Sequence, residues 1–176
     1  MGNQTTPRPR AVLVGTMGAG KTTVGQLLAE RWGVGFRDTD HDVEATAGKA
    51  VSDIFVEDGE ATFRALERGA VATALASHDG VLALGGGAVL DESTRALLAD
   101  HTVVFLEVGL SDAASRVGLG VSRPLLLGNV RARVKQLLDE RTPIYQSVAS
   151  VRIPTDGRTP DEVADAVIAA LEAGNE

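Results

Sequence analysis

The stretch Gly15-Thr-Met-Gly-Ala-Gly-Lys-Thr22 decides the fold of this chain. It matches the pattern G-x-x-x-x-G-K-[S/T], and its surroundings are those that the pattern requires. The apolar run Ala11–Val14 precedes it and predicts a buried strand, while Lys21–Trp32 follows with apolar residues at helical spacing. A strand, a glycine-rich loop and a helix in this order predict a loop that binds phosphate groups.

The chemistry of this loop favours a nucleoside triphosphate as its ligand. Glycines let the backbone bend so that its N–H groups point inward at phosphate oxygens. The positive end of the following helix adds to the attraction. Lys21 can reach the β- and γ-phosphates, and the hydroxyl of Thr22 can bind Mg²⁺. The alternative is a glycine-rich turn with no ligand, and the strand–helix context makes this the weaker interpretation.

The rest of the chain alternates strand-like and helix-like segments. The predicted strands are Ala11–Val14, Val34–Arg37, Val81–Leu84, Thr102–Glu107 and Val148–Ile153. The predicted helices are Lys21–Trp32, Asp40–Ala47, Val51–Glu57, Glu60–Ser77, Glu92–Ala99, Ser111–Val117 with Ser111 as a candidate N-cap, Val130–Glu140, and a last helix that starts at Pro160 after a Thr159 cap. This alternation predicts an α/β fold, with a five-stranded parallel sheet between two layers of helices. Ligands of such sheets bind beyond the carboxyl ends of the strands.

Two carboxylates follow the second predicted strand. Asp38 and Asp40 are two residues apart, so they project to the same side if the strand continues. At the carboxyl edge of the sheet they would lie near the phosphate loop. Asp38 could hold Mg²⁺, directly or through water, and Asp40 could orient or deprotonate an acceptor hydroxyl. The alternative is that one of them only caps the helix that begins near Asp40.

Composition limits the other functions. The chain has 176 residues and a net charge of −7, which suits one domain and argues against nucleic acid or an anionic membrane as the partner. Cysteine is absent, which excludes disulfides and thiol catalysis, and no run approaches the ~20 apolar residues that cross a membrane. Residues 1–10 are polar, and we expect a disordered leader there, followed by a single domain at 11–173. We further expect a cytoplasmic protein, with a monomer as the default state because no heptad pattern argues for assembly.

Arginine supplies most of the positive charge, since only three of the 17 basic residues are lysines. Its guanidinium suits bidentate binding of carboxylates and phosphates. Arg123 lies in the glycine-rich stretch 118–128, which is expected to form a flexible lid. Arg64 and Arg141 also have plainer interpretations. The first could pair with neighbouring glutamates of its own helix, and the second could complement the dipole at a helix end before Pro143.

Several motifs, taken in order, resemble those of the shikimate kinase family from about Ala11 to Leu171. They are Gly15–Thr22, Asp38-Thr-Asp40 with Val43-Glu44, Ile54-Phe55 followed by Asp58-Gly-Glu60, Phe63-Arg64 and Glu67, Leu84-Gly-Gly-Gly-Ala88, Arg123-Pro-Leu-Leu126, and Arg141-Thr-Pro-Ile-Tyr145. Other P-loop kinases share only the first, so the ordered set is specific. The resemblance implies a P-loop kinase fold of the nucleoside monophosphate kinase type. It also implies ATP-dependent phosphorylation of the 3-hydroxyl of shikimate, in the pathway to chorismate and aromatic amino acids.

The resemblance further implies a role for each matching residue. On the ATP side the residues are Gly18, Ala19, Gly20, Lys21, Thr22 and Thr23 at the phosphates, Thr22 and Asp38 at Mg²⁺, Arg116, Arg158 and Pro160 at the adenine, and Arg123 in the lid. On the acceptor side, centred on residues 38–67, they are Asp40 at the hydroxyls, Arg64 and Arg141 at the carboxylate, and Gly86 as a backbone donor in a turn that Gly85 and Gly87 shape. Lys21, Asp40 and Arg123 would be catalytic, with Asp40 as the base.

Two other functions compete with this one. A gluconate kinase shares the phosphate loop and also needs arginines for a carboxylate. The combination of both aspartates, Arg64, the triple glycine and Arg141 favours shikimate over gluconate. A nucleotide-binding switch that hydrolyses slowly and has no acceptor would leave the arginines outside the phosphate loop unexplained.

Overall fold

A parallel sheet forms the centre of the molecule, of which the computed structural model describes residues 6–16, 18–118 and 127–174. The sheet has five strands in the order β2-β3-β1-β4-β5, and every neighbouring pair is parallel. The strands are β1 (Ala11–Val14), β2 (Phe36–Asp38), β3 (Val81–Ala83), β4 (Val103–Glu107) and β5 (Val151–Pro154). The predicted α/β class and parallel sheet are confirmed.

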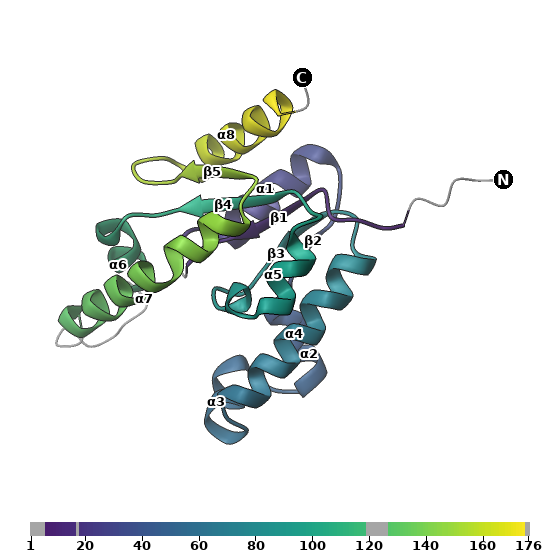
Figure 1. Cartoon of the computed structure of the whole chain (residues 1–176). Helices are drawn as coiled ribbons and strands as arrows, with labels where there is room; N and C mark the ends of the chain where they lie inside the picture. Colours follow the sequence, from purple (N-terminus) through teal and green to yellow (C-terminus); the bar gives the residue numbers. More distant parts are fainter. Residues whose placement is uncertain (1–5, 17, 119–126, 175–176) are drawn as a thin grey trace.

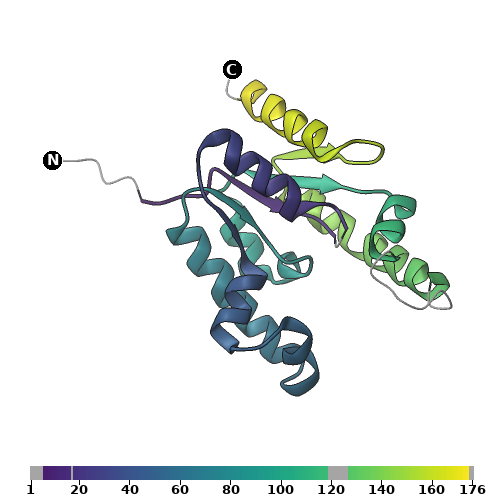
Figure 2. The same ribbon diagram turned by 180° about the vertical axis from the view of Figure 1, so that it is seen from behind.

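Helices cover both faces of this sheet (Figure 1). Their bounds are α1 (Lys21–Trp32), α2 (Thr39–Ala47), α3 (Val51–Glu57), α4 (Glu60–Ser77), the 3₁₀ turn η1 (Ala88–Leu90), α5 (Glu92–Leu98), α6 (Leu110–Gly118), α7 (Leu127–Val148) and α8 (Pro160–Ala173). Apolar residues of α1 and α8 share one core cluster, and those of α4, α5 and α7 share a second one. From both sides of the molecule, α2 and α3 are seen to extend away from the sheet with one end of α4 (Figure 2). No described helix is long and apolar enough to cross a membrane.

The central strand β1 shows how the sequence produces this three-layer arrangement. All its residues are buried, and successive side chains point to opposite faces of the sheet. Ala11 and Leu13 belong to the cluster with α1 and α8, whereas Val12 and Val14 belong to the cluster with α4, α5 and α7. A strand buried on both faces must be apolar throughout, which explains the uninterrupted run before the phosphate loop.

The strand β2 begins two residues later than expected because the N–H of Val34 bonds to the end of α1. The helix α1 ends at Trp32, as predicted, and Gly33 follows it with a left-handed backbone conformation (φ 65°). The N–H of Val34 then donates to the carbonyl of Ala29 (2.9 Å), a closing bond typical of glycine-terminated helices. Pairing with β3 therefore starts only at Phe36.

The helix α7 is much longer than predicted, and the expectation that Arg141 lies at a helix end was wrong. Pro143 lies inside this helix and cannot donate a backbone hydrogen bond, so the sequence suggested an end there. Tyr145 is fully buried, however, and its ring stacks on that of Phe105 with centroids 5.2 Å apart. This tertiary packing holds the helix together past the proline, and β5 begins correspondingly later than expected.

The start of α6 differs from the expected one. Ser111 does not cap α6, which begins at Leu110. The carbonyl of Gly109 accepts the N–H of Ala113 instead (3.0 Å), while the N–H of Gly109 donates to the carboxylate of Asp156.

Of the predicted lid 118–128, both ends are helical, since Gly118 closes α6 and residues 127–128 open α7. Arg123 lies outside the described residues.

Two glycines inside helices test whether the packing between α1 and β2 is as tight as the structure indicates. A methyl group on Gly25 would lie 2.9 Å from a ring carbon of Phe36 and 3.2 Å from a methyl carbon of Leu13. We expect Gly25→Ala to lower the free energy of unfolding by about 1–3 kcal/mol through overpacking. Gly69 in α4 has no neighbouring atom within 4 Å of that position, so Gly69→Ala should raise it by about 0.5–1 kcal/mol through helix propensity. Urea denaturation measures both, and a stabilised Gly25→Ala protein would contradict this packing.

Candidate functional site

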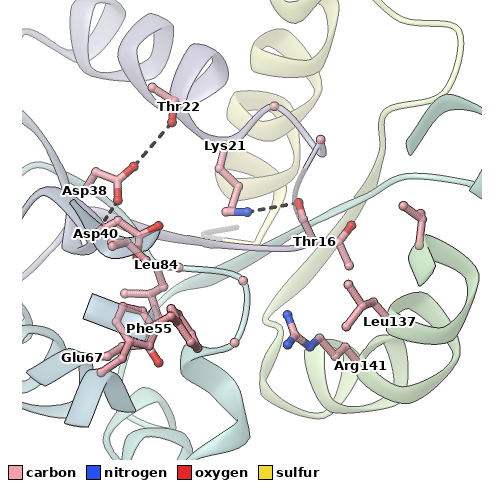
Figure 3. A pocket seen from close by; sticks show the side chains of 18 of the residues that line it. Thr16, Lys21, Thr22, Asp38, Asp40, Phe55, Glu67, Leu84, Leu137 and Arg141 are labelled. Atoms are coloured by element: carbon pink, nitrogen blue, oxygen red, sulfur yellow. Dashed lines mark hydrogen bonds between the residues drawn. The ribbon is translucent and has the colours of Figure 1, made fainter. Parts of the chain in front are cut away.

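A cavity of about 830 Å³ lies at the carboxyl ends of β1, β2 and β3. The segments that follow these three strands all contribute to its wall, and α3, α4 and α7 supply the rest. Figure 3 shows Asp40, Phe55 and Glu67 on one side and Leu137 and Arg141 on the other, with Lys21 between them. The predicted site residues that line the cavity are Gly18, Gly20, Lys21, Thr22, Thr23, Asp38, Asp40, Arg64, Gly85, Gly86, Gly87 and Arg141.

The phosphate loop takes the shape that its glycines permit. Gly18 and Gly20 have positive φ angles of 85° and 89°, and Gly20 directly precedes α1. Gly15 is needed for a different reason, because a methyl group there would lie 2.7 Å from the carbonyl oxygen of Leu106. Ala19 is fully buried and belongs to the core. Its side chain therefore anchors the loop instead of lining the cavity.

Lys21 is held at the centre of the loop. Its ammonium group donates to the carbonyls of Gly15 (2.7 Å) and Thr16 (3.1 Å). Burial lowers the pKa of Lys21 to about 8, although the carboxylates of Asp40 and Asp38 act in the opposite direction. A lysine in this state becomes fully charged when an additional negative group arrives beside it.

Asp38 connects the starts of two helices. Its side chain accepts the N–H of Asp40 (2.9 Å) and so caps α2. Its other oxygen lies 3.5 Å from the hydroxyl of Thr22, which donates to it. The strand ends at this residue, so Asp38 and Asp40 do not share one strand face. Both carboxylates reach the cavity because Asp38 caps α2, and not because they share a strand face as expected.

Asp40 lies in the first turn of α2 and faces the phosphate loop across the cavity (Figure 3). Burial raises the pKa of its carboxyl group, and the negative charge of Asp38 raises it further, whereas Lys21 lowers it. A carboxylate with a raised pKa is a better proton acceptor than an ordinary aspartate.

Arg64 projects from α4 and is paired within its own helix, as its plainer interpretation predicted. It lies 2.8 Å from Glu67 and 3.7 Å from Glu60. Glu67 is only 4% exposed, and burial raises the pKa of its carboxyl group while Arg64 opposes this effect. Arg64 nevertheless lines the cavity. The ion pair and a place in the site therefore coexist.

The triple-glycine turn packs directly against these charged groups. A methyl group on Gly85 would lie 2.6 Å from a carboxylate oxygen of Asp40. A methyl group on Gly87 would lie 2.6 Å from a guanidinium nitrogen of Arg64. A side chain at Gly85 or Gly87 would displace the acidic or the basic group, so these two positions require glycine.

Arg141 reaches the cavity from the middle of α7, which forms the wall opposite α4 (Figure 3). With Lys21, Arg64 and Arg133 it makes four basic residues that line a cavity whose acidic members are Asp38, Asp40 and Glu67. Arginines on opposite walls can approach a planar anion from two sides, which suits a carboxylate.

The predicted adenine-binding residues lie outside this cavity. Arg116 donates to the carbonyl of Gly18 (2.7 Å), so α6 contacts the phosphate loop directly. Pro160 is the first residue of α8, which a Thr159–Glu162 capping box starts. Arg158 is exposed in the preceding turn, and its N–H donates to the carbonyl of Thr155 (3.2 Å).

Several lining residues were not among the predicted site residues. Phe55 and Phe63, for which the sequence favours a core position with a place in the acceptor wall as the alternative, lie with ring centroids 4.6 Å apart and planes tilted by 35°, and form an apolar wall next to Arg64. The other unpredicted members are Thr16, Val51, Glu67, Leu84, Arg133, Val134 and Leu137. Glu67 had a signal in the sequence, its spacing of three from Arg64. Arg133 had none, because its position depends on the true length and direction of α7.

The site also offers the chemistry that a magnesium ion requires. Mg²⁺ prefers oxygen ligands and is usually bound by few protein groups together with substrate phosphates. The hydroxyl of Thr22 and the carboxylate of Asp38 are adjacent oxygen donors beside the phosphate loop. These two side chains therefore fit a nucleotide-bound Mg²⁺.

Comparison with known proteins identifies the family. The family model described as shikimate kinase matches residues 17–172. A protein named shikimate kinase from Thermobifida fusca is 63% identical over 169 residues, covering 96% of this chain and 98% of that protein. The structure of shikimate kinase from Acinetobacter baumannii in complex with shikimate is similar with a TM-score of 0.87 and 34% identity, covering 96% of this chain and 95% of that one.

The gluconate kinase alternative can be judged by the same two measures, sequence identity and TM-score. A gluconokinase from Sinorhizobium meliloti is 21% identical with a TM-score of 0.60, covering 97% of this chain and 94% of that one, so it shares the fold alone. The family model and the Thermobifida relative both extend over nearly the whole chain, which belongs to the shikimate kinase family.

Proposed function

We propose that this protein transfers the γ-phosphoryl group of ATP to the 3-hydroxyl of shikimate, giving ADP and shikimate 3-phosphate for the pathway to chorismate and aromatic amino acids. One observation carries the proposal. A single cavity contains the phosphate loop, the carboxylate of Asp40, and guanidinium groups on two opposite walls. A nucleotide-binding switch would need only the first of these. Membership of a kinase family supports the same choice.

The phosphate loop would bind the triphosphate of ATP. Phosphoryl transfer needs little covalent help from the protein, so positioning and charge neutralisation supply most of the catalysis. The backbone N–H groups of residues 18–20 and the hydroxyls of Thr22 and Thr23 would contact phosphate oxygens. Lys21 would exchange its bonds to the loop carbonyls for bonds to phosphate oxygens, and would counter the charge of the transferring group.

Asp40 would bind the reacting hydroxyl and accept its proton. Its raised pKa makes it a suitable acceptor for a proton that leaves the hydroxyl as the new P–O bond forms. The position of Asp40 opposite Lys21 supports this role, because the acceptor oxygen has to lie between the base and the phosphate.

The acceptor carboxylate would lie between Arg64 and Arg141. Shikimate carries one carboxylate and three hydroxyls, so it needs a fixed cationic end and hydrogen-bond acceptors at the other end. Arg64 and Arg141 supply the first, and Asp40 supplies the second. Gly86 and Gly87 would add backbone N–H donors, and the neighbouring rings of Phe55 and Phe63 would cover the apolar ring edge.

Thr22 and Asp38 would hold Mg²⁺, directly or through water. When bound, this ion would neutralise phosphate charge and keep the β- and γ-phosphates in a fixed orientation.

The adenine would be surrounded by Arg116, Arg158 and Pro160. Arg123, from the stretch predicted as a lid, would contact the phosphates. We expect a cytoplasmic monomer, and the net charge of −7 argues against nucleic acid or an anionic membrane as a partner.

Asp40 can be tested by a change that preserves shape and removes the base. We expect Asp40→Asn to lower kcat by about 10²-fold or more, with the Kd for MgATP changed by less than about threefold. Asp42→Asn is the matched control, because Asp42 pairs with Arg37 (2.7 Å) outside the cavity. Steady-state kinetics with shikimate and calorimetry with MgATP measure the two quantities. An unchanged kcat would remove Asp40 from the mechanism.

Arg141 can be tested by truncation. Loss of a charge-assisted hydrogen bond costs about 1.5–3 kcal/mol, so Arg141→Ala should raise the KM for shikimate about tenfold or more and leave the KM for ATP nearly unchanged. Arg152→Ala is the control, since Arg152 pairs with Glu107 (2.7 Å) away from the cavity. A defect confined to ATP would contradict the acceptor role.

The lowered pKa of Lys21 predicts that nucleotide binding is coupled to protonation. Lys21 in the free protein is about half protonated at pH 8 because its pKa is about 8. Bound phosphates favour the charged form and raise this pKa, so binding takes up about half a proton at pH 8 and almost none at pH 6.5, where the lysine is already charged. Calorimetry of MgATP binding in buffers with different ionisation enthalpies measures this uptake. Lys21→Met should abolish it, and equal uptake at both pH values would refute the coupling.

A further inference from the structure

The triple-glycine turn is held by two buried hydroxyl groups that come from opposite sides of the site. The hydroxyl of Tyr145 donates to the carbonyl of Gly86 (2.5 Å). The hydroxyl of Thr39 accepts the N–H of Gly85 (3.2 Å). Neither side chain lines the cavity, and both are fully buried, at 0% exposure. Neither hydroxyl would therefore touch a ligand in the cavity directly.

The bonds from Tyr145 and from the N–H of Ala88 fix the Gly86–Gly87 and Gly85–Gly86 peptide groups of the turn, while the bond to Thr39 holds the Leu84–Gly85 peptide just before them. The C=O and N–H of a trans peptide point in opposite directions, and the chain has no cis peptide bond among its described residues. Because Tyr145 holds the carbonyl of Gly86, the N–H of Gly87 must point away from Tyr145. The carbonyl of Gly85 accepts the N–H of Ala88 (3.0 Å), which fixes the N–H of Gly86 in the same way.

The N–H groups of Gly86 and Gly87 are available for a ligand. Within the described part of the chain, neither of them has a protein acceptor. Both residues line the cavity, and the guanidinium of Arg64 packs against Gly87. Two aligned donors beside a guanidinium are suited to a carboxylate oxygen.

The three glycines make the backbone of the turn flexible, so the bonds from the two hydroxyls are needed to hold it in one conformation. A run of three glycines has more backbone freedom than any other tripeptide, so the turn would sample many orientations without external bonds. The position of Tyr145 on α7 adds a second consequence. It follows Arg141 by one helical turn, and its buried ring stacks on Phe105 of β4. The same helix thus carries the guanidinium and the group that orients the turn.

We propose that Tyr145 and Thr39 are positioning residues for the acceptor carboxylate. They hold the Gly85–Gly87 turn so that its N–H groups and the guanidiniums of Arg64 and Arg141 converge on one anion. This proposal rests on the acceptor site described under the proposed function. It assigns a role to two side chains that the motifs alone left without one.

The test uses pairs of variants in the whole enzyme. Tyr145→Phe and Thr39→Val each remove one hydroxyl and keep the shape of the side chain, while Thr39→Ser keeps the hydroxyl. Ser150→Ala is the control, because the Ser150 hydroxyl also bonds to a backbone group, the N–H of Val103 (3.0 Å), but at the opposite edge of the sheet. Kinetic constants for shikimate, for its methyl ester and for ATP are measured, together with thermal unfolding of each variant.

We expect kcat/KM for shikimate to fall about tenfold in Tyr145→Phe and in Thr39→Val, with the KM for ATP changed less than about twofold. Because both residues act through one turn, the double variant should lose less than the product of the two single effects. Thr39→Ser should retain activity within about threefold. The methyl ester lacks the charged carboxylate, so the same variants should change its kcat/KM less than about twofold.

A merely structural role predicts something else. Loss of folded protein would lower the rates for both acceptors equally, and would appear in the unfolding temperature and in the Ser150→Ala control. Equal losses for shikimate and its ester, or an unchanged kcat/KM for shikimate, would overturn the positioning role. Arg141→Ala separates this failure from a wrong acceptor site. If Arg141→Ala raises the KM for shikimate and Tyr145→Phe does not, only the positioning role fails.

Discussion

The parallel pairing of β1 with β3, and of β3 with β2, is the constraint on which the site depends. Leu13 is in register with Ala83, and Ala83 with Asp38. The three strands therefore end at the same edge, and the loops that follow them are neighbours. These loops are the phosphate loop, the triple-glycine turn and the Asp38–Asp40 segment. A shift of one residue in either register would turn the buried side chains to the wrong face, so the spacing between phosphate and acceptor groups is fixed by the core.

Electrostatic balance is the second condition that this edge has to meet. The cavity is lined by four basic residues and three acidic ones, namely Lys21, Arg64, Arg133 and Arg141 against Asp38, Asp40 and Glu67. A buried charge without a partner is costly, and the pKa shifts show where compensation is incomplete. Burial lowers the pKa of Lys21 and raises the pKa of Asp40 and Glu67. A bound phosphate would therefore stabilise the charged form of Lys21, whereas it would act against the charged forms of the two carboxyl groups.

Sequence reasoning succeeded where the determinants are local and failed where they are tertiary. The bounds of α1 follow from the phosphate loop at one end and from Gly33 at the other, and both were predicted correctly. The end of α7 depends on the burial of Tyr145 against Phe105, which no local pattern reveals, and Pro143 pointed to the wrong place. The position of Arg133 at the cavity follows from that same helix. The start of β2 was missed because the closing bond of α1 uses Val34.

Arg64 and Asp38 show why a choice between a structural and a functional interpretation can be a false one. Each was open to a plain explanation, an ion pair in a helix for Arg64 and a helix cap for Asp38, and both explanations are correct. Each side chain also lines the cavity. Glu67 holds one nitrogen of the Arg64 guanidinium at the cavity wall, and the cap fixes one oxygen of Asp38 while the other stays near Thr22. A side chain that has to bind a ligand in one orientation needs such a partner to restrict its rotamers. In this site, the local interactions that the sequence predicts therefore orient the functional groups toward the cavity.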